Sequence, residues 1–147
     1  MKNKIIFLDI DGVLNLRSKK KWDSGCINNL NQILILTNAK IVVTSTWRCT
    51  YNLEELQNIF INQGIEGEVV GITEQLGHRA TEILTWVEEN DIDEYVVIDD
   101  RYAELEDDIP EENFFKLDQH IGLRDNDIKT AIIFKLNPDL IFNIMKG

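Results

Sequence analysis

The sequence contains few of the residues that cross-link or interrupt a chain, with two cysteines and two prolines among 147 residues. Cys26 and Cys49 lack the paired spacing of a zinc site and are too few for a disulfide-dense secreted domain. No apolar run approaches the roughly 18 residues of a membrane span, and the N-terminus leads straight into a strand pattern without signal-peptide features. We therefore expect a reduced, cytoplasmic protein with no membrane partner.

Two common phosphate-binding signatures are also absent, since neither G-x-G-x-x-G nor G-x-x-x-x-G-K-[ST] occurs. Dinucleotide-binding and P-loop functions therefore lack sequence support. The net charge of −11 is unevenly spread, because residues 1–50 hold 8 Lys and Arg against 3 Asp and Glu. The positive charge includes RSKKK, residues 17–21, which forms either a basic lip beside a site or a solvated basic loop.

Hydrophobic periodicity predicts alternating strands and helices. Strand patterns cover residues 4–8, 40–44, 68–73, 94–100 and 113–117. Helix patterns cover residues 23–38, 52–64, 79–90 and 125–136, and a last short one extends to Lys146. Strands joined through helices favour right-handed crossovers. We expect an α/β fold, a three-layer Rossmann-like sandwich with a mostly parallel five-stranded sheet, forming one domain over residues 1–147.

The stretch FLDIDGVLN, residues 7–15, places two carboxylates directly after an apolar strand pattern. A carboxylate beside buried backbone is costly without a partner. Asp9 and Asp11, followed by Gly12, suit a hard divalent cation with oxygen ligands. A surface turn of the D-x-D-G type is the alternative interpretation of this stretch alone.

Polar groups follow three of the predicted strands, and these ends share one edge of a parallel sheet. They are Asp9-Ile10-Asp11, Thr44-Ser45-Thr46-Trp47-Arg48 and Asp99-Asp100-Arg101. One acid can attack phosphorus and a second can move protons, while hydroxyls and a cation hold phosphate oxygens. Mg²⁺ would relieve the repulsion among the acids and neutralise phosphate charge. The combination is typical of phosphoryl transfer.

With these motifs, the chain resembles the haloacid dehalogenase-like (HAD) phosphohydrolase superfamily. DIDGV, the strand-ending hydroxyls, an intervening basic residue and DD occur in the superfamily's order. More narrowly, VVTSTWR, GHRATEILTWV and YVVIDDR resemble small HAD domains of RNA-repair proteins, related to polynucleotide 3′-phosphatase domains. The resemblance implies an enzyme, an HAD-type phosphomonoester hydrolase that acts through an aspartyl-phosphate.

The resemblance also implies a role for each motif residue. Asp9 corresponds to the nucleophile and Asp11 to the general acid/base, with a backbone carbonyl on the metal. Ser45 is the first choice for the phosphate-binding hydroxyl, with capping of the next segment as its alternative role, and Thr44 is the second choice. Arg79 would also bind substrate phosphate, with Arg48 and Arg101 as phosphate contacts or salt-bridge partners. The metal site for Mg²⁺ would comprise Asp9, Asp11, Asp99 and Asp100. Trp47 is either a core residue or a platform on which a base stacks.

The lengths between motifs leave no room for a cap domain. About 25 residues separate Asn15 from the second strand, and one helix pattern fills the next interval. The resemblance implies that such an open site serves a large substrate, and RSKKK lies beside it in the sequence, so a phosphorylated nucleic-acid end or nucleotide is the leading expectation. The alternatives are phosphatases of small phosphate esters or phosphoproteins, a regulatory phospho-acceptor domain without turnover, and a binding module. The leaving group and oligomeric state stay open.

Overall fold

A five-stranded sheet forms the centre of the protein. The computed structural model describes residues 3–19, 21–101, 105 and 107–140. The strand order is β5-β4-β1-β6-β7, and every neighbouring pair is parallel. The strands are β1 (Lys4–Leu8), β4 (Lys40–Val43), β5 (Val69–Ile72), β6 (Glu94–Asp99) and β7 (Phe114–Lys116). The predicted Rossmann-like sheet is confirmed, and it is wholly parallel.

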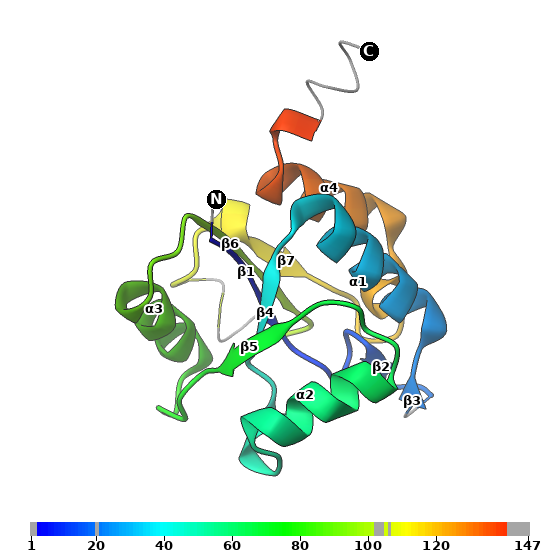
Figure 1. The fold of residues 1–147 in the computed structure, drawn as a ribbon, viewed down its shortest axis with the longest axis horizontal. Coiled ribbons are helices and arrows are strands. Elements are labelled where there is room, and N and C mark those ends of the chain that lie inside the picture. The colour runs from blue at the N-terminus through cyan, green and yellow to red at the C-terminus, as the bar shows by residue number, and fades with distance from the viewer. Residues whose placement is uncertain (1–2, 20, 102–104, 106, 141–147) are drawn as a thin grey trace.

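Four α-helices cover the two faces of this sheet (Figure 1). They are α1 (Ser24–Thr37), α2 (Leu53–Asn62), α3 (Arg79–Glu89) and α4 (Asn126–Leu136). Because side chains alternate along a strand, Ile6 and Leu8 join α1, α2 and α4 in one hydrophobic cluster, whereas Ile5 and Phe7 join α3 in another. Three layers result, as expected.

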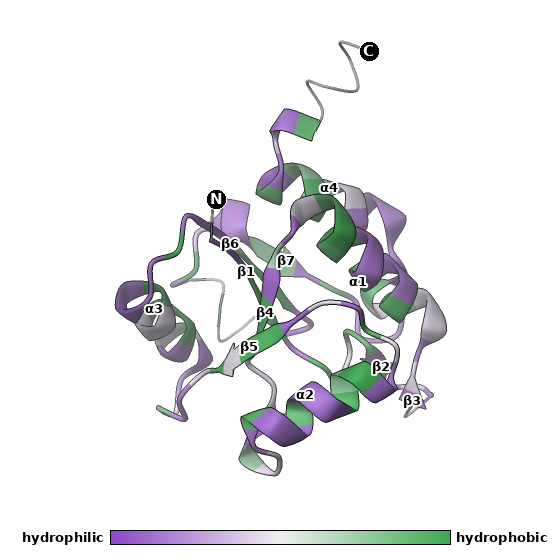
Figure 2. Cartoon of the chain, in the orientation of Figure 1, coloured by the Kyte–Doolittle hydropathy of each residue, from purple (hydrophilic) through white to green (hydrophobic). Residues whose placement is uncertain are grey.

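The central strands β1, β4 and β6 are buried on both sides, which explains their nearly continuous apolar sequence. Figure 2 shows hydrophobic residues in the central strands and mixed hydrophobic and hydrophilic residues along the helices. Ile6, Phe7 and Leu8 are fully buried. Burying such a side chain contributes about 1.5–3 kcal/mol. Strand β1 therefore ends inside the core, and Asp9 is the first residue beyond it.

Side-chain caps define where the helices begin. The Asp23 carboxylate accepts a hydrogen bond from the Cys26 backbone N–H at 3.0 Å, at the start of α1. Asn52 and Glu55 form the predicted capping box at the start of α2. Such caps satisfy backbone N–H groups that have no partner within the helix. None of the described helices is long and apolar enough to cross a membrane.

The structure differs from the sequence prediction between β1 and α1. A small antiparallel hairpin, β2 (Asn15–Leu16) and β3 (Lys21–Trp22), replaces the expected loop. The basic segment RSKKK spans this hairpin, with Lys20 outside the described residues. No cap domain occurs among the described residues here, or between β4 and β5, which a 3₁₀ helix (Thr46–Cys49) and α2 connect. The predicted last helix to Lys146 lies mostly outside the described residues.

Candidate active site

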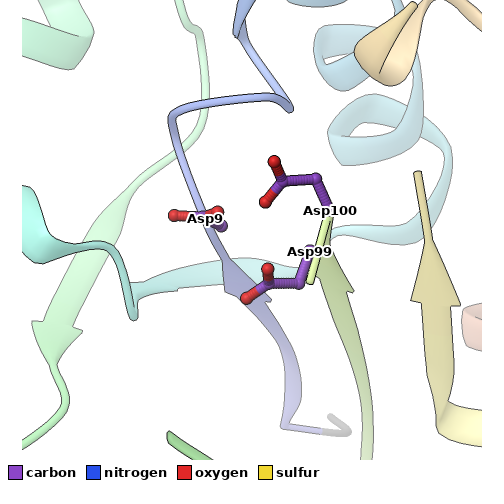
Figure 3. A group of neighbouring side chains, drawn as sticks. All are labelled: Asp9, Asp99 and Asp100. Carbon is purple, nitrogen blue, oxygen red and sulfur yellow. The ribbon is translucent and has the colours of Figure 1, made fainter. Parts of the chain in front are cut away.

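Three carboxylates meet at the C-terminal edge of the sheet (Figure 3). Asp9 follows β1, Asp99 is the last residue of β6, and Asp100 comes next. β1 and β6 are parallel neighbours with Leu8 beside Ile98, so both strands end at the same level. One oxygen from each carboxylate lies within 4.8 Å of the others. Sheet register thus brings together acids that are 90 residues apart in the sequence.

These acids are withdrawn from solvent and close to one another. Asp9 and Asp99 are 3% and 0% exposed. Burial raises the pKa of Asp9 well above its usual range, the charge of Asp99 raises it further, and Arg79 opposes both. Burial likewise raises the pKa of Asp99 against the influence of Arg79. Such carboxylates ionise reluctantly unless a cation joins them.

Arg79 supplies one positive charge inside this group. As the first residue of α3, it projects a buried guanidinium toward the sheet edge. Its Nη1 lies 2.7 Å from Asp99 Oδ2 and 3.6 Å from Asp9 Oδ2. Its ion pair with Asp99 holds Arg79 beside the acids, and its predicted role in binding substrate phosphate stays a prediction.

The oxygens of Asp99 and Asp100 differ in their partners. Asp99 accepts from Arg79 on one oxygen and from the Arg101 backbone N–H, at 2.9 Å, on the other. Asp100 Oδ2 accepts from Arg17 Nε at 2.9 Å, whereas its buried Oδ1 has no hydrogen-bond partner in the described part of the chain. A buried oxygen without a partner suits a metal ligand. The acid cluster therefore fits a hard cation such as Mg²⁺.

Asp11 lies outside this three-acid group, and two side chains hold its carboxylate. Trp47 Nε1 lies 3.2 Å from both Asp11 oxygens, and Asn15 Nδ2 lies 3.1 Å from Oδ1. The Trp47 ring packs edge-on against Trp22, with the ring centres 5.6 Å apart. Sequence analysis did not find the Trp47 contact, because 36 residues separate the partners. It gave no role to Asn15, although a spacing of four residues in a turn allows contact.

The two candidate hydroxyls have different surroundings. Ser45 Oγ accepts a hydrogen bond from the Trp47 backbone N–H at 3.2 Å and caps the 3₁₀ helix, the alternative role expected for it. Thr44 Oγ1 is buried and has no hydrogen-bond partner among the residues that the structure describes. β4 ends at Val43, so Thr44 is the first residue beyond the strand. Of the two candidates, Thr44 is therefore the one whose hydroxyl has no hydrogen-bond partner in the described chain.

Arg48 is placed differently from the predicted phosphate contact. Its guanidinium is buried, with Nη2 2.7 Å from Glu82 Oε1 and Nη1 2.7 Å from the Thr44 carbonyl oxygen. Nε donates to the Thr73 carbonyl oxygen at 3.1 Å. These bonds tie the ends of β4 and β5 to α3. Arg48 is therefore a buried salt-bridge partner of Glu82 and not of the acids in the cluster.

The comparison with known families agrees with this arrangement. A family model described as "HAD domain in Swiss Army Knife RNA repair proteins" matches residues 5–128 of the 147. The chain belongs to this family. The match spans all motif residues of the HAD domain, from Asp9 to Arg101, and confirms the resemblance to a small HAD-like domain. No curated protein and no solved structure matches the chain.

Proposed function

We propose that this HAD domain is a Mg²⁺-dependent phosphatase that removes a terminal phosphate from nucleic-acid ends through an aspartyl-phosphate on Asp9. The observation that carries the proposal is the cluster of Asp9, Asp99 and Asp100, with Arg79 paired to Asp99 and Asp9. Family membership supports the HAD-type chemistry, and the RNA-repair description of the family supports the substrate class.

In the first step, an Asp9 carboxylate oxygen forms a bond to phosphorus while the bond to the leaving oxygen breaks. Asp11 donates a proton to that oxygen, so the product leaves as an alcohol. In the second step, the Asp11 carboxylate takes a proton from water, whose oxygen bonds to phosphorus. The acyl phosphate bond then breaks, inorganic phosphate departs, and Asp9 is restored.

The surrounding residues position these groups. Trp47 and Asn15 donate to Asp11 and hold its carboxylate in one orientation. Thr44 offers a hydroxyl without a partner in the described chain, which supports it as the phosphate-binding hydroxyl ahead of Ser45. Arg79 would balance negative charge on the phosphoryl oxygens. Arg48 takes no part in this proposal, because its guanidinium is engaged with Glu82 and backbone carbonyls.

Asp9, Asp100 and the Asp11 backbone carbonyl would hold Mg²⁺. Asp99 would instead hold Arg79 in place through the hydrogen bond from its Nη1. Asp100 Oδ1 has no hydrogen-bond partner within the described ranges of the chain, which favours Asp100 over Asp99 as the direct ligand. When bound, Mg²⁺ neutralises acid and phosphate charge and acts as a Lewis acid toward a phosphoryl oxygen.

Phosphate release with Mg²⁺ tests the proposal. The substrates are a 3′-phosphorylated oligonucleotide, its 5′-phosphorylated counterpart and p-nitrophenyl phosphate. We expect release fastest from the 3′ end, and an Asp9→Asn loss on the order of a thousandfold or more. Asp127→Asn, on the exposed first turn of α4, is the matched control and should retain activity. Near-normal activity of Asp9→Asn would refute the covalent route, and preference for the small ester would remove the nucleic-acid substrate.

A further inference from the structure

A hollow of about 540 Å³ lies directly beside the acid cluster. Its lining comes from the β2–β3 hairpin, the end of β6, and the end of β7 with the loop beyond. The residues are Arg17, Asp100, Arg101, Lys116, Leu117, Asp118, Gln119 and His120. Asp100 belongs to both the hollow and the acid cluster, so the two are adjacent. The volume falls within the range of about 300–1,000 Å³ typical of ligand sites.

The charge of this hollow differs from that of the whole chain. Three cationic side chains line it, Arg17, Arg101 and Lys116, although the net charge of the chain is −11. Of the two acids in its lining, Asp100 pairs with Arg17, and Asp118 Oδ1 accepts from the His120 backbone N–H at 2.8 Å. The three cations are supplied by separate segments that the fold brings to one wall. Such a lining attracts an anionic group.

We propose that this hollow is a second phosphate subsite, which holds the phosphodiester preceding the terminal phosphate of an oligonucleotide. This proposal rests on the proposed function and specifies its substrate as longer than a mononucleotide. The terminal phosphate occupies the cluster at Asp9, and the chain of the substrate passes Asp100 into the hollow. Arg17, Arg101 and Lys116 then contact the phosphodiester, as cationic side chains contact nucleic-acid backbones without reading sequence.

Three ligands test whether the hollow binds a second phosphate group of any kind or specifically a phosphodiester. A nucleoside 3′-monophosphate has only the terminal phosphate, whereas a nucleoside 3′,5′-bisphosphate carries a second one. A dinucleotide with a 3′-phosphate carries a phosphodiester instead. Kd is measured by calorimetric titration in the Asp9→Asn background with Mg²⁺, where turnover does not consume the ligand. Steady-state kcat/KM for the same compounds is measured in the wild-type protein.

Lys116→Ala is the informative substitution, because the Lys116 side chain is exposed at the end of β7 and is not among the residues proposed to hold the metal or the terminal phosphate. Arg17 is less suitable, since its loss also removes the partner of Asp100. Lys40→Ala is the matched control, because Lys40 pairs with Glu68 at the opposite edge of the sheet, where β4 begins. Lys116→Arg, which retains the charge, should restore binding.

We expect the dinucleotide to bind roughly tenfold more tightly than the monophosphate, and Lys116→Ala to reduce this ratio about three- to tenfold. For dinucleotide binding, the slope of log K against log salt concentration should also become shallower by about 0.7 in Lys116→Ala, the value for one phosphate contact with a single strand. Lys40→Ala should leave the ratio unchanged. Equal effects on monophosphate and dinucleotide, or equal binding of the two, would overturn the subsite.

Binding and turnover distinguish this failure from failure of the proposed function. Turnover that is the same for all three compounds would keep the phosphatase and refute the subsite. A Lys116-dependent advantage in binding, without any phosphate release, would support the subsite and refute the phosphatase. A bisphosphate that matches the dinucleotide in both measurements would assign the hollow to a second phosphate group rather than to a nucleic-acid backbone, and would overturn the phosphodiester claim.

Discussion

At the scale of single residues, Trp47 has two possible roles. It could orient the carboxylate of Asp11, the proposed proton donor, or it could only pack against its neighbours, and a substitution distinguishes the two. We expect Trp47→Phe to lower kcat/KM about tenfold for an alkyl phosphate, because phenylalanine keeps an aromatic ring at this position but lacks the indole N–H that donates to Asp11. The effect on p-nitrophenyl phosphate should be less than about threefold, since its leaving group departs without a proton. Steady-state rates for both esters check the difference.

The control for this substitution is Trp86→Phe, because Trp86 packs with the cluster on the other sheet face and touches none of the acids. It should alter neither ester's kcat/KM. Equal losses for both esters in Trp47→Phe would instead mean that the indole only supports packing around Trp22 and Tyr51.

Thr44 offers a second test at this scale, because its buried hydroxyl has no partner in the described chain. Removing a buried, unpaired polar group is neutral or stabilising for the fold. We therefore expect Thr44→Val to keep or raise Tm while reducing kcat/KM more than tenfold. Thr73→Val removes a buried hydroxyl that likewise has no hydrogen-bond partner among the described residues. It should match the Tm change but retain activity, and a similar activity loss in both variants would remove Thr44 from the phosphate site.

At the scale of elements, the turn after β1 must come very close to β6. Gly12 has φ +80°, and a Cβ there would clash with Asp100 Oδ2. Gly12→Ala should therefore displace Asp100, abolish the Mg²⁺-induced rise in Tm and lower activity more than tenfold. Gly64, with φ +84° and open space around it, is the matched control. Both substitutions incur backbone strain of about 1–2 kcal/mol. Gly64→Ala should keep the Mg²⁺ response, and loss of that response in both variants would contradict this explanation.

The elements also show how far sequence reasoning extends. The five strand patterns were predictable, because each is an apolar run bounded by polar residues, and the capping box of Asn52 and Glu55 marked a helix start. The β2–β3 hairpin was not predictable, because strands of two residues have no measurable periodicity. The pairing of Arg48 with Glu82 was also out of reach, since it depends on how α3 packs beside β4.

At the candidate site, prediction succeeded where strand ends determine position and failed where side chains select their partners. Asp9 and Asp99 converge because β1 and β6 are parallel neighbours. Ser45 was the first choice for the phosphate-binding hydroxyl, yet only the local geometry reveals that Ser45 caps a 3₁₀ helix while Thr44 has no described partner. Motifs therefore located the edge of the sheet, and packing determined which atoms face one another there.

At the scale of the whole molecule, the buried acids make stability depend on pH and on divalent cations. Asp9 and Asp99 have pKa values raised above the ordinary 3.8, so the folded state binds more protons than the unfolded state as the pH rises above that value. The stability contribution of each acid therefore falls with rising pH until the raised pKa is passed. Mg²⁺, by binding the ionised carboxylates, should offset this loss.

We expect Asp9→Asn to have a higher Tm than the wild-type protein at pH 7 in EDTA, because the variant no longer buries an ionisable carboxyl at that position. Each kcal/mol corresponds to about 2–4 °C in a domain slightly larger than this one. The difference should shrink as the pH falls below the ordinary pKa of 3.8, where the unfolded state also binds the proton of Asp9. Mg²⁺ should raise the Tm of the wild-type protein more than that of Asp9→Asn.

Asp127→Asn, whose carboxylate is exposed on α4, should follow the wild-type protein throughout. Thermal melts across pH, with EDTA and with Mg²⁺, make the comparison, and a lower Tm of Asp9→Asn in EDTA at pH 7 would show that the ionised cluster stabilises the fold without a metal.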